Sequence, residues 1–253
     1  MKDANEVLRG LSGNIRLEEE THTYILKSNP DWRCISATTL LHHHFKKFDG
    51  PKIATFLIDK VPKYRGYTID ELLEEWKMAG VNGTRTHLQL ENYIINRDPV
   101  DDVKALHGKA FLDTFIDRKD ITLHPEVILY DRDLHIAGTG DLLVVDKDNK
   151  VHIYDWKTNK KITKYGRESG ITDCTRHLTS CNYVQYSLQL SLYRWLLEQK
   201  FGLEVVSHRL IHLREDRYVA YSVPYLQTEI EMIIEDHMKH NVPDLALSPD
   251  APE

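Results

Sequence analysis

Asp141, Asp155 and Lys157 are the residues whose types and spacing most clearly suggest chemistry. Asp155 and Lys157 are separated by one residue, and side chains two apart in an extended strand point to the same side. Segments 142–146 and 151–155 are predicted to pair as a hairpin across a polar turn, which would place Asp141 opposite Asp155 or one residue away. Opposed side chains have Cβ atoms roughly 5 Å apart, and two carboxylates that close repel each other unless a cation lies between them. A divalent cation beside a lysine amine is suited to hydrolysing phosphodiesters.

An Asp-x-Lys sequence also has an ordinary structural explanation, because most such sequences are solvated ends of strands. The neighbouring residues favour a site instead. Val144, Val151 and Ile153 make the predicted hairpin apolar enough to be central in a sheet. Charged residues at the end of a buried strand need partners, and a bound cation would be one.

The composition indicates one soluble domain. The chain has 253 residues, which is enough for a substantial core, and we treat residues 1–253 as a single domain. It has no apolar run of about 18 residues and no apolar signal-peptide segment at its start, so we expect an intracellular protein that does not contact a membrane. The three cysteines are widely spaced and do not form a disulfide framework or a thiolate cluster.

The net charge of −6 argues against nonspecific coating of nucleic acid, but basic patches can still be local. Two basic segments are present, one after the predicted hairpin and one nearer the N-terminus. The first contains Lys157, Lys160, Lys161, Lys164 and Arg167, and the second contains Lys46, Lys47, Lys52, Lys60, Lys63 and Arg65. Either segment can be an ordinary solvated surface, so its value depends on where it lies relative to the carboxylates.

The hydrophobic pattern predicts an α/β fold in which helices flank a central sheet. Strands are predicted near 15–26, 31–36, 126–130, 133–137, 141–146, 151–157, 204–213 and 217–223. Helices are predicted from residue 36 and over about 51–62, 68–79, 84–97, 101–118, 183–200 and 226–240, with a long loop over 158–180 and a frayed tail over 241–253. Ser36 is a candidate N-cap, and Thr68-Ile-Asp-Glu71 is a capping-box signature. The helix that begins at Ser36 could contact a DNA phosphate or could simply be capped.

Further polar residues lie on other predicted elements. His87 precedes Glu91 by one helical turn, so both lie on one face of a helix. Glu126 lies in the strand before the hairpin. Gln189 and Tyr193 are one turn apart on an otherwise apolar helix. Taken alone, each of these residues has a structural explanation.

Taken in chain order, these residues resemble the RecB-type branch of the PD-(D/E)XK nucleases. The matching motifs are Gly83-Thr84-x-x-His87, Glu126, Gly138-x-x-Asp141, Asp155-x-Lys157 and Gln189-x-x-x-Tyr193. The resemblance covers roughly 80–195, and the segment from Ser36-Ala-Thr-Thr through a helical insertion is similar to the mitochondrial genome maintenance exonuclease and its phage and giant-virus relatives. Gly140 stands where the family often has proline, which is a common variation in this branch.

The resemblance implies a restriction-endonuclease-like core with a central mixed sheet at about 80–225, and a helical insertion or arch at about 48–80. It also implies Mg²⁺- or Mn²⁺-dependent cleavage of DNA, often from single-stranded ends, in a bacterial or virus-infected cytoplasm. The family's iron–sulfur variety has cysteines that this chain does not match, so we expect no cluster.

The roles implied for individual residues follow the family's motifs. His87, Asp141 and Asp155 would bind metal together with the carbonyl of Trp156. Lys157 would orient or deprotonate the attacking water and stabilise the developing charge. Glu126 would be an outer or second-metal carboxylate. The implied substrate contacts are Gln189, Tyr193, Ser36, Thr38, Lys160 and Lys161.

Three other functions stay open. The chain could be a structure-selective endonuclease, and cutting of circular single strands would distinguish it from an exonuclease. It could be a catalytically silent nucleic-acid-binding subunit, although the intact Asp141, Asp155 and Lys157 argue against that. It could also hydrolyse another phosphate ester. Cleavage polarity, DNA or RNA preference, the number of metals and any protein partners stay open as well.

Overall fold

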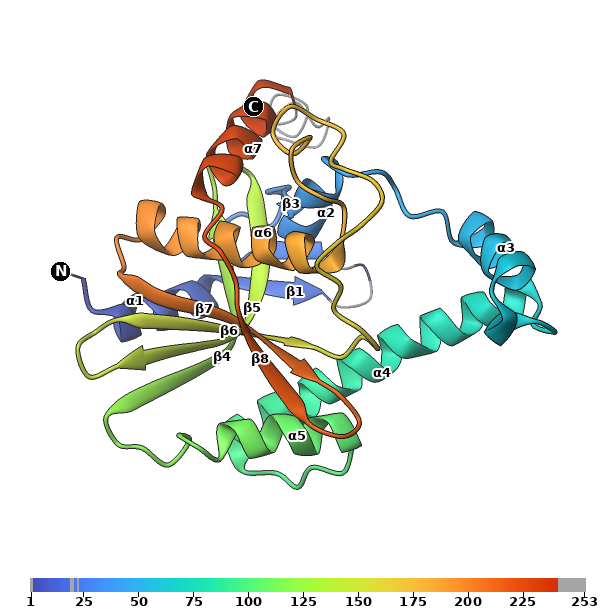
Figure 1. The fold of residues 1–253 in the computed structure, drawn as a ribbon. Coiled ribbons are helices and arrows are strands. Elements are labelled where there is room, and N and C mark those ends of the chain that lie inside the picture. Colours follow the sequence, from blue (N-terminus) through green and yellow to red (C-terminus); the bar gives the residue numbers. More distant parts are fainter. Residues whose placement is uncertain (1, 19–20, 22, 241–253) are drawn as a thin grey trace.

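The computed structural model describes residues 2–18, 21 and 23–240. Its framework is a mixed sheet with strand order β3-β5-β6-β7-β8, in which β4 also pairs with β5 (Figure 1). The strands are β3 (Ile35–Ser36), β4 (Ile121–Asp131), β5 (Ile136–Asp146), β6 (Val151–Lys157), β7 (Val205–Leu213) and β8 (Tyr218–Ser222). The β3–β5 and β6–β7 pairs are parallel and the others are antiparallel. This architecture confirms the predicted fold class.

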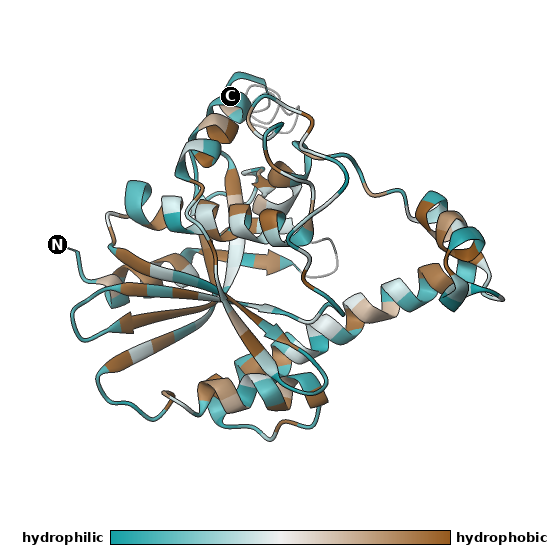
Figure 2. Ribbon diagram, in the orientation of Figure 1, coloured by the Kyte–Doolittle hydropathy of each residue, from teal (hydrophilic) through white to brown (hydrophobic). Residues whose placement is uncertain are grey.

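Helices pack on both faces of the sheet, whose strands are largely apolar (Figure 2). One core contains residues of α1 (Ala4–Asn14), α2 (Ala37–His42), α6 (Asn182–Trp195) and α7 (Gln227–His240). A second core contains residues of α4 (Ile69–Asn96) and α5 (Val103–Leu112). Ile153 belongs to the first core and Trp156 to the second. Because strand side chains alternate, Asp155 and Lys157 face the side of the sheet that α6 covers.

The N-terminal helix α1 was not predicted from the sequence. Asp3 caps it by accepting the N–H groups of Asn5 and Glu6, and Ala4, Leu8 and Leu11 are buried. It leads into a separate two-stranded sheet of β1 (Ile15–Glu18) and β2 (Thr23–Leu26). The long strand expected over 15–26 is therefore a hairpin.

Helix α4 corrects the prediction of two helices at 68–79 and 84–97. The capping box at Thr68 and Glu71 is present, but the helix continues without interruption to Asn96. Gly83 lies inside it, where a Cβ atom would be 2.9 Å from the hydroxyl oxygen of Thr158. The glycine therefore allows α4 to pass close to the end of β6 and does not end the helix.

Strand β5 likewise corrects the prediction of two strands at 133–137 and 141–146. Gly138 lies within it, and a Cβ atom there would be 2.8 Å from both Ala37 Cβ and Tyr193 Cε1. This glycine lets α2 and α6 approach the sheet closely. The strand itself continues because β4 pairs with it from Ile136 to Asp146.

The helical segment predicted near 48–80 contains α3 (Gly50–Lys60), a short 3₁₀ turn (Pro62–Tyr64) and the first part of α4. These elements, which we call the arm (residues 48–79), project from the rest of the molecule (Figure 1). The predicted tail at 241–253 lies outside the described residues. Within the described part of the chain, no helix combines the length and apolarity needed to cross a membrane.

Candidate active site

Three carboxylates lie side by side on neighbouring strands. The β4–β5 register places Glu126 opposite Asp141. The β5–β6 register ends with Leu142 paired to Tyr154, so the next residues outward, Asp141 and Asp155, face each other. This confirms the predicted opposition of Asp141 and Asp155. Glu126 lies beside them, and we call these three residues the carboxylate row.

The backbone of Glu126 is unusual for a residue within a strand. Its φ is +48°, in the left-handed region that non-glycine residues seldom adopt. Such a conformation costs roughly 1–3 kcal/mol and persists where the surrounding structure enforces it, often at functional sites. The strain at Glu126 sets this position apart from the regular part of β4.

Asp141 is held by two contacts. Its Oδ2 accepts the backbone N–H of Trp156 at 2.7 Å, which replaces a ladder hydrogen bond where the β5–β6 pairing ends. Its Oδ1 lies 3.6 Å from Nδ1 of His87, which projects from α4. Burial opposes ionisation of Asp141, but His87, Lys157 and the Trp156 N–H outweigh it, and the pKa of Asp141 lies below its usual value. Asp141 is therefore a fixed anion.

His87, Glu126 and Asp141 each offer one ligand atom, and these atoms all lie within 4.8 Å of one another. Burial and the neighbouring Asp141 charge raise the pKa of Glu126 to about 8. Burial disfavours the charged ring of His87, but Asp141 outweighs it and raises the pKa of His87 to about 9. A half-buried set with one nitrogen and two oxygen donors fits a divalent cation of the magnesium or manganese type. The structure thus groups Glu126, and not Asp155, with His87 and Asp141.

Asp155 is paired with Lys157. Its side chain is 1% exposed, and Oδ2 lies 2.6 Å from the Lys157 Nζ. Its Oδ1 is buried with no hydrogen-bond partner among the described residues. Burial raises the pKa of Asp155 to about 6 in spite of the lysine. A buried carboxylate oxygen without a donor needs a further ligand, which is consistent with a cation at this row.

The amine of Lys157 has three neighbours. Besides Asp155, it donates to Oε1 of Gln189 at 3.3 Å and lies 4.5 Å from the centre of the Tyr186 ring. Burial opposes its charge, but Asp155 and Asp141 outweigh burial and raise its pKa above the usual value. Lys157 is therefore a charged donor with a fixed direction.

Gln189 and Tyr193, predicted as a functional pair, do contact each other. The amide of Gln189 donates to the Tyr193 hydroxyl at 3.2 Å while its carbonyl accepts from Lys157. Tyr193 is 2% exposed and packs against Gly138. Gln189, backed by Tyr193, thus supports the lysine from inside the protein.

The remaining predicted substrate contacts lie elsewhere. Ser36 caps α2 by accepting the N–H of Thr39, and its hydroxyl also lies 3.2 Å from that of Thr38. Lys160 forms an ion pair with Glu75 on α4, and Lys161 is exposed. No contact in the described residues joins any of these four to the carboxylates, so their roles as substrate contacts stay predictions, as does metal binding by the Trp156 carbonyl.

Two residues that the sequence did not indicate hold the backbone after Lys157. Lys104 on α5 donates to the carbonyl of Thr158 at 2.6 Å, and Nε2 of His212 on β7 donates to the carbonyl of Asn159 at 2.6 Å. His212 pairs with Lys157 across the parallel β6–β7 ladder. Such pairing between strands distant in sequence leaves no local signal.

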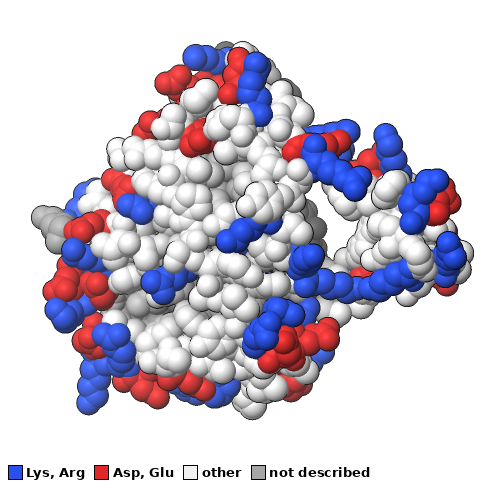
Figure 3. Space-filling model, viewed as in Figure 1, with Lys and Arg blue, Asp and Glu red and all other residues white. Residues whose placement is uncertain are grey.

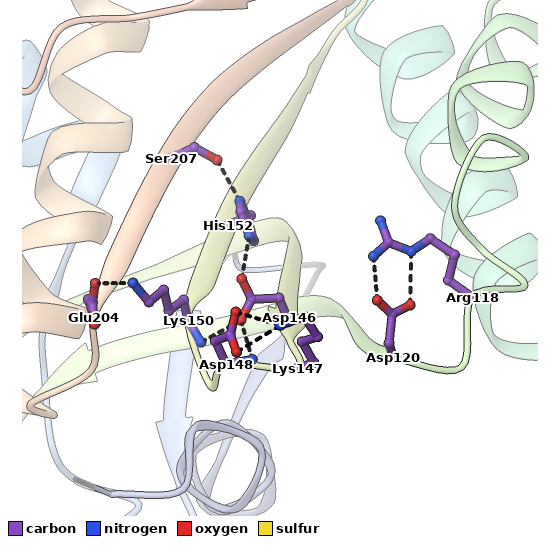
Figure 4. Close-up of polar contacts among 9 residues, drawn as sticks. All are labelled: Arg118, Asp120, Asp146, Lys147, Asp148, Lys150, His152, Glu204 and Ser207. Carbon is purple, nitrogen blue, oxygen red and sulfur yellow. Dashed lines mark hydrogen bonds and ion pairs between the residues drawn. The ribbon is translucent and has the colours of Figure 1, made fainter.

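A second polar cluster lies at the turn between β5 and β6 (Figure 4). His152 lies 2.8 Å from the Ser207 hydroxyl and 3.3 Å from Asp146. Asp146 also accepts the N–H groups of Asp148 and Lys150 and so closes the turn. These contacts tie the turn to β7, and we assign them a structural role.

Comparison with known proteins shows one family. The sequence pattern of the PD-(D/E)XK nuclease superfamily matches residues 39–246. Among solved structures, SSO0001 is 15% identical with a TM-score of 0.40, covering 94% of this chain and 84% of that one. A candidate exonuclease from Eubacterium rectale is 13% identical with a TM-score of 0.38, covering 85% and 80%. No curated protein matches the chain.

Proposed function

The chain belongs to the PD-(D/E)XK nuclease superfamily, and we propose that it is a Mg²⁺- or Mn²⁺-dependent DNA exonuclease that prefers single-stranded or frayed ends. The observation that carries the proposal is the cluster of His87, Glu126 and Asp141 beside the Asp155–Lys157 pair. The acidic groups lie close together, half-buried or buried, and the amine beside them is charged. This combination suits hydrolysis of a phosphodiester.

His87, Glu126 and Asp141 would hold the cation, with Asp155 adjoining it in the carboxylate row. Magnesium prefers oxygen ligands and keeps several waters, while the ring nitrogen of His87 favours manganese. A bound divalent cation supplies Lewis-acid stabilisation of phosphate charge and makes water a stronger nucleophile.

Lys157 would stabilise the charge that develops on the attacked phosphate. Its raised pKa keeps it protonated, so we assign it charge stabilisation and orientation of the water and not proton removal. Gln189 and Tyr186 restrict the direction of its amine. A donor that is already oriented needs little reorganisation when charge develops.

The preference for single strands is supported by the arm, which carries Lys and Arg side chains interspersed with Asp and Glu (Figure 3). Exposed aromatic rings lie on and beside its helices, including Phe48, Phe56 and Tyr67, which are 66%, 53% and 42% exposed. Aromatic faces stack on unpaired bases with about 1–3 kcal/mol for each base. Exposed rings together with the lysines and arginine of the arm would therefore favour an unpaired strand.

The preference for ends is supported by how the arm joins the rest of the molecule. Chain segments connect it at both ends, and open space lies between the arm and the rest of the molecule (Figure 3). Two ion pairs attach the loop over 158–180 to this region: Lys46–Glu168 to the segment that leads into the arm, and Lys160–Glu75 to the arm itself. We infer that a strand threads through this space from a free end.

The test is a cleavage assay with the purified protein in Mg²⁺, Mn²⁺ or chelator. The substrates are 5′- and 3′-labelled DNA single strands, strands with blocked ends, circles, duplexes and a matched RNA strand. We expect linear DNA to be degraded from an end, circles to resist, chelator to stop cleavage, and Asp141→Asn to be inactive. Cutting of circles at the linear rate would identify an endonuclease. Binding without cleavage under every metal condition would identify a silent subunit.

A further inference from the structure

A second group of basic and aromatic residues lies outside the arm, on α6 and β8. Tyr183 and Tyr186 are three residues apart on α6, so their side chains share one face of the helix. The amine of Lys157 lies over the Tyr186 ring at 4.5 Å, and the amine of Lys164 lies over the Tyr183 ring at 4.9 Å. Two lysines thus rest on successive rings of one helix face.

Lys164 is also close to β8. Its amine lies 5.7 Å from the centre of the Tyr221 ring, and Tyr221 sits opposite Leu210, whose side chain belongs to the core that α6 covers. Tyr183 and Tyr221 are both half-buried, while Lys164 is exposed. The amine is therefore placed between two rings at the surface.

The backbone next to Lys164 is fixed by hydrogen bonds to the start of α6. The N–H and hydroxyl of Thr163 donate to Oδ1 of Asn182 at 2.7 and 3.1 Å. The amide of Asn182 donates in turn to the carbonyl of Lys161 at 2.8 Å. A cation that is already positioned loses less conformational entropy when it binds a ligand.

The charge of Lys164 has no acidic partner among the described residues. In the portions of the chain that the structure describes, no carboxylate forms an ion pair with it, whereas Lys160 and Lys46 are paired with Glu75 and Glu168. An exposed, positioned cation between aromatic rings suits a phosphate group with sugars or bases beside it. The expected ligand is a single-stranded nucleic acid.

We propose that Lys164, Tyr183 and Tyr221 form a subsite for the phosphate next to the scissile one in a single strand. Residues three apart on a helix have Cβ atoms about 5–6 Å apart, so the two lysines lie over rings that start from neighbouring positions of α6. One strand then contacts Lys157 with the reacting phosphate and Lys164 with the adjoining phosphate. This inference rests on the proposed function and names a specific contact that the arm does not provide.

The first test measures binding of a fluorescent single strand in chelator, over a series of salt concentrations. Lys164→Gln is expected to weaken binding roughly tenfold and to lower the slope of log affinity against log salt by about 0.7, the value for one phosphate contact. The matched control is Lys147→Gln, whose lysine pairs with Asp148 at the far turn (Figure 4) and whose loss should change neither quantity. Wild-type affinity and slope for Lys164→Gln would overturn the proposal.

The second test locates the contact. Single uncharged methylphosphonates are placed at successive positions of a linear strand, and cleavage by the wild type and by Lys164→Gln is compared. The two proteins should become equal when the neutral linkage adjoins the scissile one. A difference that persists at that position would contradict the assigned place. If Lys164→Gln lowers the salt slope but the wild type cleaves no strand, the proposed function fails while the subsite stands. If the wild type cleaves normally and Lys164→Gln leaves the slope unchanged, the subsite fails while the proposed function stands.

Discussion

Replacing Lys157 by Met should damage both stability and catalysis, for separate reasons. Asp155 is 1% exposed and Lys157 is 15% exposed, with 2.6 Å between the amine and Oδ2. Removing one partner of a buried ion pair typically costs about 3–5 kcal/mol. Asp155 can relieve part of this cost by taking up a proton, because burial already raises its pKa to about 6. We therefore expect Lys157→Met to lower the free energy of unfolding by about 3 kcal/mol, near the lower end of that range.

The loss should depend on pH in a defined direction. Without Lys157, the pKa of Asp155 in the folded state rises further above the usual carboxyl value of about 3.9. The folded state then holds a proton that the unfolded state has released, so stability falls as pH rises between those two values. The destabilisation by Lys157→Met should accordingly be larger at pH 8 than at pH 6.

A double substitution separates the two effects. Asp155→Asn combined with Lys157→Met removes both charges, and such neutral replacements are often close to the original stability. Loss of a positioned donor usually costs about 10²–10³ in rate, so the double variant should regain stability and stay inactive. The assays are urea unfolding in chelator and single-turnover cleavage of a labelled strand. A Lys157→Met protein that cleaves normally, or a double variant no more stable than Lys157→Met, would refute this reasoning.

Three further predictions concern other parts of the site and its supports. Gly138→Ala should lower the free energy of unfolding, measured in urea, by about 1–3 kcal/mol, because the added Cβ would lie 2.8 Å from atoms of α2 and α6. The control is Gly10→Ala, whose Cβ meets nothing within 4 Å and should not destabilise the protein. Burial opposes the charge of Asp146, but backbone N–H groups and His152 outweigh burial and lower its pKa. The stability that the Asp146 charge contributes is therefore present above about pH 4 and is lost as pH falls through the lower pKa of the folded state. Between neutral pH and pH 3, the free energy of unfolding of Asp146→Asn should fall less than that of the wild type. Mn²⁺ at about 100 times its Kd should stabilise the wild type by about 2.7 kcal/mol in thermal unfolding, and Glu126→Gln should show much less at the same concentration; an equal shift would remove Glu126 from the cation's ligands.

The opposition of Asp141 and Asp155 could be predicted because it depends on local pairing. The two strands are joined by a short polar turn, so the register follows from counting residues back from it. The cap at Ser36 and the capping box at Thr68 are local for the same reason, and the structure has both. Features set by a few consecutive residues are thus readable from the sequence.

The parts that were missed depend on distant contacts. Gly138 suggested a strand end, so the register that places Glu126 opposite Asp141 was not worked out. Gly83 suggested a helix end, because its close approach to Thr158 is visible only in three dimensions. The support of Lys157 by Tyr186 joins residues on separate elements and also leaves no sequence pattern.

The most direct test of the account is the position of a bound divalent ion. Crystals of the protein grown with Mn²⁺ can be examined by anomalous diffraction at the manganese edge. The account predicts a peak within ligand distance of His87, Glu126 and Asp141, and its loss in Asp141→Asn crystals grown in the same way. A protein that cleaves DNA with Mn²⁺ while the ion lies elsewhere would contradict it.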